Sequence, residues 1–232
     1  STLFPYTTLF RSRVHGEDCT GAGNVSAHAE SHAPVMQQLL IKFPLVVILS
    51  SAVCFAGDYE DGTAAFDRGD YAIALKKLHP LAEQGNAPAQ NSLGGMYVEG
   101  KGGSPNFDEA IRWFRSAAQH GFAEAQTNLG WMYVEGKGVS QDYAEAAKWF
   151  RNAAEQGYAA AQYNLGGMYG RGEGVPRDFV LAYMWFSLAE KNGFQPASQL
   201  RESAEAFLTP AQIEEAQKRV SEWKSSERPP TP

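Results

Sequence analysis

Histidine, cysteine and paired acidic residues most often hold metals or carry out catalysis, and this sequence has few of them in useful arrangements. Its two cysteines are Cys19 and Cys54, so the chain from residue 57 onward has no thiol for catalysis, metal binding or a disulfide. That part contains two histidines, His79 and His120, which are far apart in the sequence. Both fall near the ends of expected helices, where we expect them to interact with the helix dipole. The sequence therefore predicts no metal site and no cofactor.

Other signs of catalysis are equally weak. Glu99 and Glu135 are separated by 36 residues, which places them on successive structural units rather than in one acid–base pair. The glycines between residues 170 and 174 alternate as in phosphate-binding loops, but no strand is expected before them, so we predict a turn. The sequence has no serine nucleophile elbow, zinc-protease helix or phosphate-loop motif. We predict no catalytic residue and a protein that is not an enzyme. The formal net charge of −6 also gives no basic excess for a nucleic-acid partner.

A period of 36 residues runs through the centre of the chain. Alanine, leucine, tyrosine, a Trp-Phe pair and glycine all return at this one interval. The recurring residues are Ala89, Ala125 and Ala161; Leu93, Leu129 and Leu165; Tyr97, Tyr133 and Tyr169; Trp113, Trp149 and Trp185; and Gly85, Gly121, Gly157 and Gly193. So many coincidences at one interval indicate a repeat architecture.

Each unit predicts two helices. Ala89, Leu93 and Tyr97 follow one another at four-residue steps, which is the spacing of a buried helical stripe. A second apolar stripe containing Trp113 follows Asn106, a residue type that caps helix N-termini. A glycine stands directly after each recurring leucine, although glycine costs about 1 kcal/mol in a helix interior. We therefore expect the second helix to approach closely there, in an all-α fold of stacked antiparallel helix hairpins.

The motif that carries these helices resembles a known family. The pattern L-G-x-x-Y followed by A-x-x-x-F resembles the tetratricopeptide repeat, but the loop inside the hairpin, E-G-K-G-V-S-Q-D, is longer. With A-x-x-W-F and A-A-x-x-G, the pattern is similar to the Sel1-like repeat over residues 58–193. The resemblance implies a right-handed α-solenoid that binds a protein or peptide. Some cysteine-rich members hydrolyse β-lactams, a minor alternative here because the repeats contain no cysteine.

The segments outside the repeats have distinct compositions. Residues 1–12 resemble the translation of a sequencing-library adapter and are left out of the fold. A Pro-rich tail ends the chain and is expected to be disordered. The expected organisation is an artefact at 1–12, a disordered or untranslated leader at 13–35, a signal peptide at 36–56, a cap-like hairpin at 57–85, three repeats at 86–193, a closing helix pair at 194–224 and a tail at 225–232.

The segment 36–56 has the layout of a secretory signal. Lys42 precedes an apolar run over residues 43–55, and the small residues Cys54 and Ala56 precede the expected cleavage after Ala56. The run is shorter than the roughly 20 residues that a membrane-spanning helix needs. We therefore expect a periplasmic or secreted bacterial protein that is not inserted in a membrane once the signal is removed. Lipidation of Cys54 and a buried core segment are the alternatives.

A partner-binding surface is expected where the period is broken. The recurring tryptophans are assigned to the core, but Trp131 has glycine counterparts, Gly95 and Gly167. Tryptophan is enriched at binding hot spots, so Trp131 is a candidate anchor on the concave surface formed by the first helices. The alternative is that its ring fills the space beside its neighbours' glycines.

Polar residues next to Trp131 complete this candidate surface. Asn128 and Asn164 precede the recurring leucines and are candidates for holding a peptide backbone, or for local structural hydrogen bonds. The positions before them are expected to be exposed and carry Asn91, Thr127 and Tyr163. The favoured function is an exported scaffold that binds a protein or peptide. The alternative is a structural or inhibitor-like module of a cell-wall enzyme that binds through its convex edge.

Overall fold

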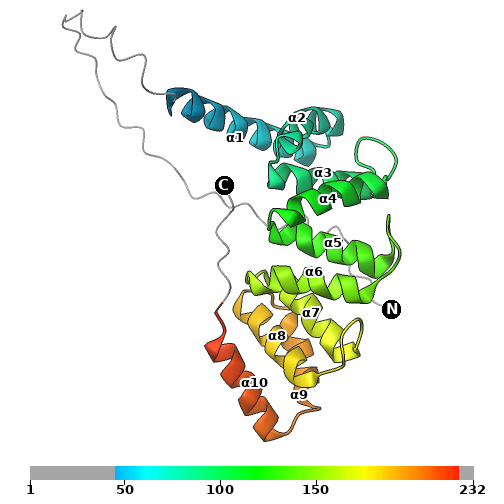
Figure 1. Ribbon diagram of the computed structural model, residues 1–232, viewed down its shortest axis with the longest axis vertical. Helices are drawn as coiled ribbons and strands as arrows, with labels where there is room; N and C mark the ends of the chain where they lie inside the picture. The colour runs from blue at the N-terminus through cyan, green and yellow to red at the C-terminus, as the bar shows by residue number, and fades with distance from the viewer. Residues whose placement is uncertain (1–44, 225–232) are drawn as a thin grey trace, which may run out of the picture. The chain divides into compact units, whose positions relative to one another are not determined.

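The computed structural model describes residues 45–224, with side chains from residue 57 onward, and this part of the chain folds into ten α-helices without a strand (Figure 1). The helices are α1 (Leu45–Arg68), α2 (Tyr71–Glu83), α3 (Ala87–Glu99), α4 (Phe107–Gln119), α5 (Ala123–Glu135), α6 (Tyr143–Glu155), α7 (Ala159–Arg171), α8 (Phe179–Lys191), α9 (Ala197–Glu205) and α10 (Pro210–Glu222). None of the helices in this part is long and apolar enough to cross a membrane. The expectations for residues 1–12, 13–35, 36–44 and 225–232 lie outside the described residues, as do those for the side chains of 45–56.

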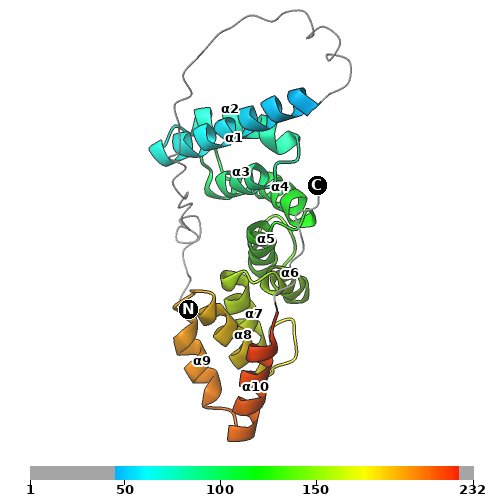
Figure 2. The ribbon, with the colours of Figure 1, turned by 90° about the vertical axis from the view of Figure 1, so that its left-hand side faces the viewer.

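The chain divides into two compact units at Phe55–Ala56, and the second unit holds the repeats. Its hairpins α3–α4, α5–α6 and α7–α8 follow one another in sequence order, as Figures 1 and 2 show. Each second helix contacts the first helix of the next hairpin, in the pairs α2–α3, α4–α5 and α6–α7. The predicted all-α solenoid of stacked antiparallel hairpins is confirmed.

The ends of the helices follow from local sequence. Asn106, Asp142 and Asp178 each accept a hydrogen bond from a first-turn backbone N–H of α4, α6 and α8, at 2.9–3.1 Å. The first helices end at a glycine in the left-handed conformation. At Gly136, for example, φ is 66°, and its N–H donates to the Met132 carbonyl. These caps fix where each hairpin turns.

The glycine after each recurring leucine marks a close helix crossing, as predicted. A Cβ placed on Gly130 would lie 2.7 Å from Cε1 of Phe150, well inside van der Waals contact. Gly94 and Gly166 face Phe114 and Phe186 in the same way. The phenylalanine of the second helix therefore lies directly on the backbone of the first.

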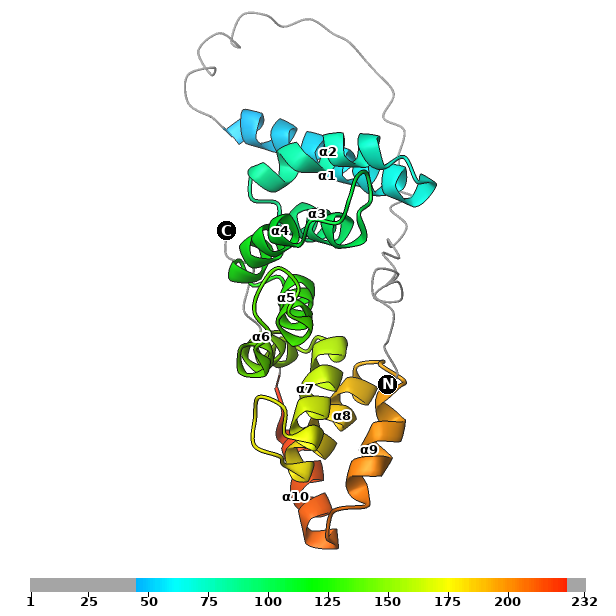
Figure 3. The same cartoon turned by 90° about the vertical axis from the view of Figure 1, so that its right-hand side faces the viewer.

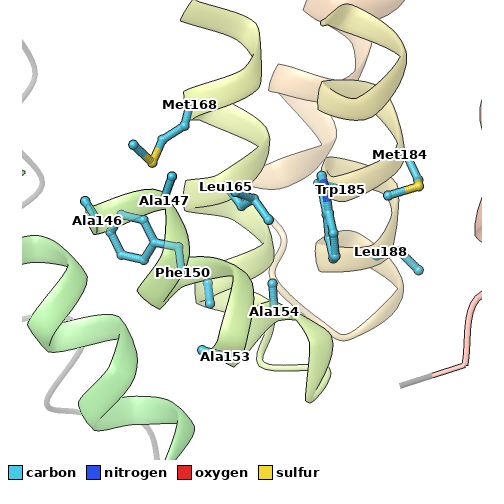
Figure 4. Close-up of a cluster of buried hydrophobic side chains, with 11 residues drawn as sticks. Ala146, Ala147, Phe150, Ala153, Ala154, Leu165, Met168, Met184, Trp185 and Leu188 are labelled. Carbon is cyan, nitrogen blue, oxygen red and sulfur yellow. The ribbon is translucent and has the colours of Figure 1, made fainter. Parts of the chain in front are cut away.

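The core is a series of aromatic and aliphatic clusters along the stack. In one of them, Phe150 of α6, Leu165 of α7 and Trp185 of α8 come together, with Leu165 between the other two (Figure 4). Trp113 and Trp185 are buried, which confirms their assignment to the core, whereas Trp149 is half-buried against a cluster formed by α4 and α5.

Helices α9 and α10 pack on α8 and close the stack (Figure 3). Thr209 and Gln212 form a capping box at the start of α10. Trp223 packs edge-on against Trp185 at 4.9 Å between ring centroids. Phe207 stacks on Phe179 at 4.4 Å and remains 67% exposed.

Candidate partner-binding surface

The two histidines of the repeat region take structural positions. His79 lies within α2, where its Nε2 is 3.0 Å from the Tyr97 hydroxyl and its ring contacts Trp113 edge-on. These contacts give His79 a packing role between α2 and the next hairpin. His120 caps the end of α4 and lies 2.8 Å through Nδ1 from the Ser116 carbonyl oxygen, close to the expected position.

The acidic and glycine-rich features also match their structural interpretations. Glu99 and Glu135 end α3 and α5 and pair with nearby lysines of their own loops. The glycine run at 170–174 forms the turn between α7 and α8, with φ of 73° at Gly172 and 69° at Gly174. Across residues 57–224, no group of three or more His, Cys, Asp or Glu side chains is arranged to hold a metal.

Asn91 and Asn128 meet between neighbouring first helices. The Nδ2 group of Asn128 donates to Oδ1 of Asn91 at 2.9 Å, and both side chains are buried. Thr127 is also buried, and its hydroxyl donates back to the Ala123 carbonyl within α5. The expected exposure of Asn91 and Thr127 is therefore wrong, because these positions face the neighbouring helix. The Asn91–Asn128 contact joins two repeats.

Trp131 lies on α5 and is half-buried. Its ring packs edge-on against Phe150 at 5.8 Å, and its Nε1 is buried without an acceptor in the described part of the chain. At the equivalent position in α7, Gly167 is covered instead by Arg171, whose Nη1 would lie 3.0 Å from an added Cβ. Trp131 therefore both fills space beside its own hairpin and presents part of an aromatic ring to solvent.

Tyr163 and Asn164 lie one hairpin further along and are half-buried. The Tyr163 ring contacts Phe186 and Phe194 at 5.7 and 4.9 Å. Burial raises the pKa of Tyr163. Tyr163 thus belongs to the packing between α7, α8 and the closing segment.

Glu124 is the residue of this surface that the sequence reasoning missed. It lies four residues before Asn128 and seven before Trp131, so all three share one face of α5. Its side chain is half-buried and hydrogen bonds to Asn91. Burial raises the pKa of the Glu124 carboxyl, and the hydrogen bond with Asn91 partly offsets the increase.

Tyr59 of α1 extends the set of polar residues around Asn91 and Glu124. The hydroxyl of Tyr59 lies 3.4 Å from Oγ of Ser92, the neighbour of Asn91. Burial raises the pKa of Tyr59, the Ser92 hydrogen bond opposes this, and the charge of Glu124 adds to it. We call Tyr59, Asn91, Ser92, Glu124 and Asn128 the inner polar cluster. A sequence signal for it existed, since Glu124 has Pro88 and Ala160 as its counterparts in the period.

Stacked helix hairpins joined by recurring contacts define an α-solenoid, a class that typically presents extended surfaces to other proteins. The family match is more specific: the Sel1 repeat model matches residues 87–122, 123–158 and 159–194, so the chain contains three Sel1 repeats. No curated protein is similar enough to the chain to count as a match.

Two solved structures illustrate the similarity. A Sel1 repeat protein from Oxalobacter formigenes is 35% identical, with a TM-score of 0.57 over 60% of this chain and 57% of its own. A protective antigen present in uropathogenic Escherichia coli strains, which displays an SLR fold, is 30% identical with a TM-score of 0.52, over 77% of this chain and 47% of its own. The chain thus spans about half of the length of these structures.

Proposed function

We propose that this protein is an exported scaffold that binds a protein or peptide at the surface of α3 and α5, around Trp131. Trp131 carries the proposal: the neighbouring units have glycine at this position, so the hairpin does not require an aromatic ring there. An aromatic ring that is half-buried and held against Phe150 is a rigid contact for a partner, at low cost in conformational entropy. The proposal assigns no catalytic residue, metal, cofactor or nucleic acid to this role.

Export rests on the apolar segment 43–55 and the small residues before the Ala56–Gly57 bond. Asp58 and Tyr59, which contact Lys77 and Ser92, follow that bond and would remain with the processed protein. Mass spectrometry of the protein from the bacterial envelope fraction should find Gly57 at the N-terminus. An intact chain from Met36 or a fatty acid on Cys54 would contradict a freely diffusing exported protein.

Binding at Trp131 is tested by affinity capture with a matched control. Trp149 is also a half-buried tryptophan whose Nε1 has no acceptor in the described region, but it lies on the second helix α6. Trp131→Ala should lose a partner that the wild type captures, whereas Trp149→Ala should retain it. Both variants are compared well below their unfolding temperatures, measured by circular dichroism. Equal capture by the two variants would place the binding surface elsewhere.

A further inference from the structure

We propose that the inner polar cluster is a subsite for an organic cation, the protonated amine or guanidinium of a basic residue in the partner, with Glu124 as its counter-charge. The inference rests on the proposed binding at α3 and α5 and names the chemistry of the partner there. It adds a charged contact to the aromatic one at Trp131, on the same face of α5.

The first step is the absence of an internal cation. Among residues 57–224, no lysine, arginine or histidine forms an ion pair with Glu124. The comparable first-turn glutamates of α4 and α6 behave differently. Glu109 pairs with Arg112 at 2.6 Å, and Glu145 pairs with Lys148 at 2.8 Å. One turn after Glu124, the chain carries Thr127 and Asn128 instead of a basic residue.

The second step is that the surrounding groups are arranged for hydrogen bonding and not for neutralising charge. Asn128 donates to Asn91, and Asn91 in turn hydrogen bonds to Glu124. Such a chain orients the carboxylate, and the N-terminus of α5 favours its charge, but neither supplies a full positive charge in this partly desolvated position. A cation that arrives with a partner would form a charge-assisted hydrogen bond with this carboxylate.

The third step is the position of Trp131. Seven residues of helix separate it from Glu124, which is about 10 Å along the axis at 1.5 Å per residue. A short peptide can therefore contact both side chains with one basic and one apolar residue. In α7, Ala160 replaces the glutamate and Arg171 covers Gly167, so this pairing is specific to α5.

The subsite can be tested without knowing the partner. The probes are N-acetyl-argininamide, N-acetyl-lysinamide and glycinamide, which offer a guanidinium, a side-chain amine and an α-amine. Neutral N-acetyl-glutaminamide is the control ligand. Each is titrated into the full-length protein while the side-chain amide signals of Asn91 and Asn128 are followed by NMR. At least one cation should shift these signals to saturation, whereas the neutral amide should not. The cation that binds best shows whether the partner supplies a guanidinium, a side-chain amine or an α-amine.

The decisive variant is Glu124→Gln, which keeps an oxygen for the Asn91 hydrogen bond but removes the charge. It should weaken cation binding by about tenfold or more, the size expected for the loss of a charge-assisted hydrogen bond. Glu214→Gln removes the same charge from an exposed position of α10 and should bind as the wild type does.

Three results would overturn the subsite: no response to any cation, an equal response to the neutral amide, or unchanged binding by Glu124→Gln. A failure of this kind is separate from a failure of the proposed function. The latter is decided by partner capture with Trp131→Ala and Trp149→Ala.

Discussion

A glutamine in each of the first helices α3, α5 and α7 hydrogen bonds to the preceding hairpin, and one of these glutamines keeps an unsatisfied acceptor. The Nε2 groups of Gln90, Gln126 and Gln162 donate to the last-turn carbonyls of the preceding second helix at 2.9–3.1 Å. In two of the three, the remaining Oε1 is also satisfied. Gln126 accepts from Gln156 at 2.7 Å, and Gln162 accepts from Asn192 at 2.9 Å.

Gln90 lacks this second partner. Its Oε1 is buried without a hydrogen bond to any described residue, although the side chain is only 3% exposed. The residue that corresponds to Gln156 and Asn192 is His120, and all three occupy the C-cap of their helix. His120 donates through Nδ1 to the Ser116 carbonyl instead. The period is thus broken at a position where an amide would complete the network.

Replacing His120 with Gln should therefore stabilise the protein. Satisfying the buried acceptor of Gln90 should stabilise the protein by about 1–3 kcal/mol. Ordering the new glutamine side chain opposes this by roughly 1 kcal/mol of conformational entropy. Loss of the exposed contact between His120 and Ser116 takes away about 0.5 kcal/mol more. The expected net gain is about 0.5 kcal/mol, which corresponds to about 1–2 °C in the unfolding temperature for a domain of this size.

Thermal unfolding followed by circular dichroism measures this gain, with His120→Ala as the control. The alanine variant loses the same histidine contact without supplying a donor, so it should be no more stable than the wild type. The reciprocal change, Gln156→His, should destabilise the next repeat by removing the donor to Gln126. If His120→Gln and His120→Ala unfold at the same temperature, the missing donor is not what limits this contact.

Two further predictions concern helix packing and charge. Gly130→Ala should destabilise the protein by about 1–3 kcal/mol because its Cβ would overlap Phe150. Gly170→Ala should stabilise it by up to about 1 kcal/mol because the nearest atom is 3.9 Å away; urea unfolding distinguishes the two signs. The raised pKa of Glu124 means that its ionised form is less favourable in the folded protein than in the unfolded chain. The resulting loss of stability is complete above the folded-state pKa. It disappears as the pH falls below the unfolded-state pKa of about 4.3. Glu124→Gln should therefore unfold at a higher temperature than the wild type at pH 7, with the difference shrinking towards pH 4, and a constant difference would contradict this sign.

Most of the fold could be predicted from sequence because short-range sequence patterns determine the structure of each unit. The caps at Asn106 and Asp142, the glycine under Phe150 and the capping box at Thr209 are all short-range patterns with one structural solution. Repetition then made each pattern visible several times. The stacking of hairpins followed from the same pattern, since a single hairpin cannot bury both of its apolar faces.

The candidate surface could be predicted only in part, because it depends on contacts between units. Trp131 was visible as a break in the period, but the burial of Asn91 and Thr127 was not. Whether a polar residue of α3 faces solvent or α5 depends on how far successive hairpins rotate, and the spacing within one helix does not determine that rotation. Glu124 was missed because acidic residues in a first helical turn are common and usually need no explanation.

The breaks in the period differ in what they do to the free protein. At His120, the break leaves the buried Oε1 of Gln90 without a donor among the described residues. Glu124 and Trp131 also carry a cost, since one is a desolvated carboxylate without a cation and the other has an indole N–H without an acceptor. These two lie together on one face of α5, whereas His120 lies at the far end of α4. A partner that binds this face would supply a positive charge for Glu124 and cover the exposed part of the Trp131 ring. Restoring the repeat at His120 should therefore improve stability alone, whereas removing the charge at Glu124 should improve stability and weaken binding.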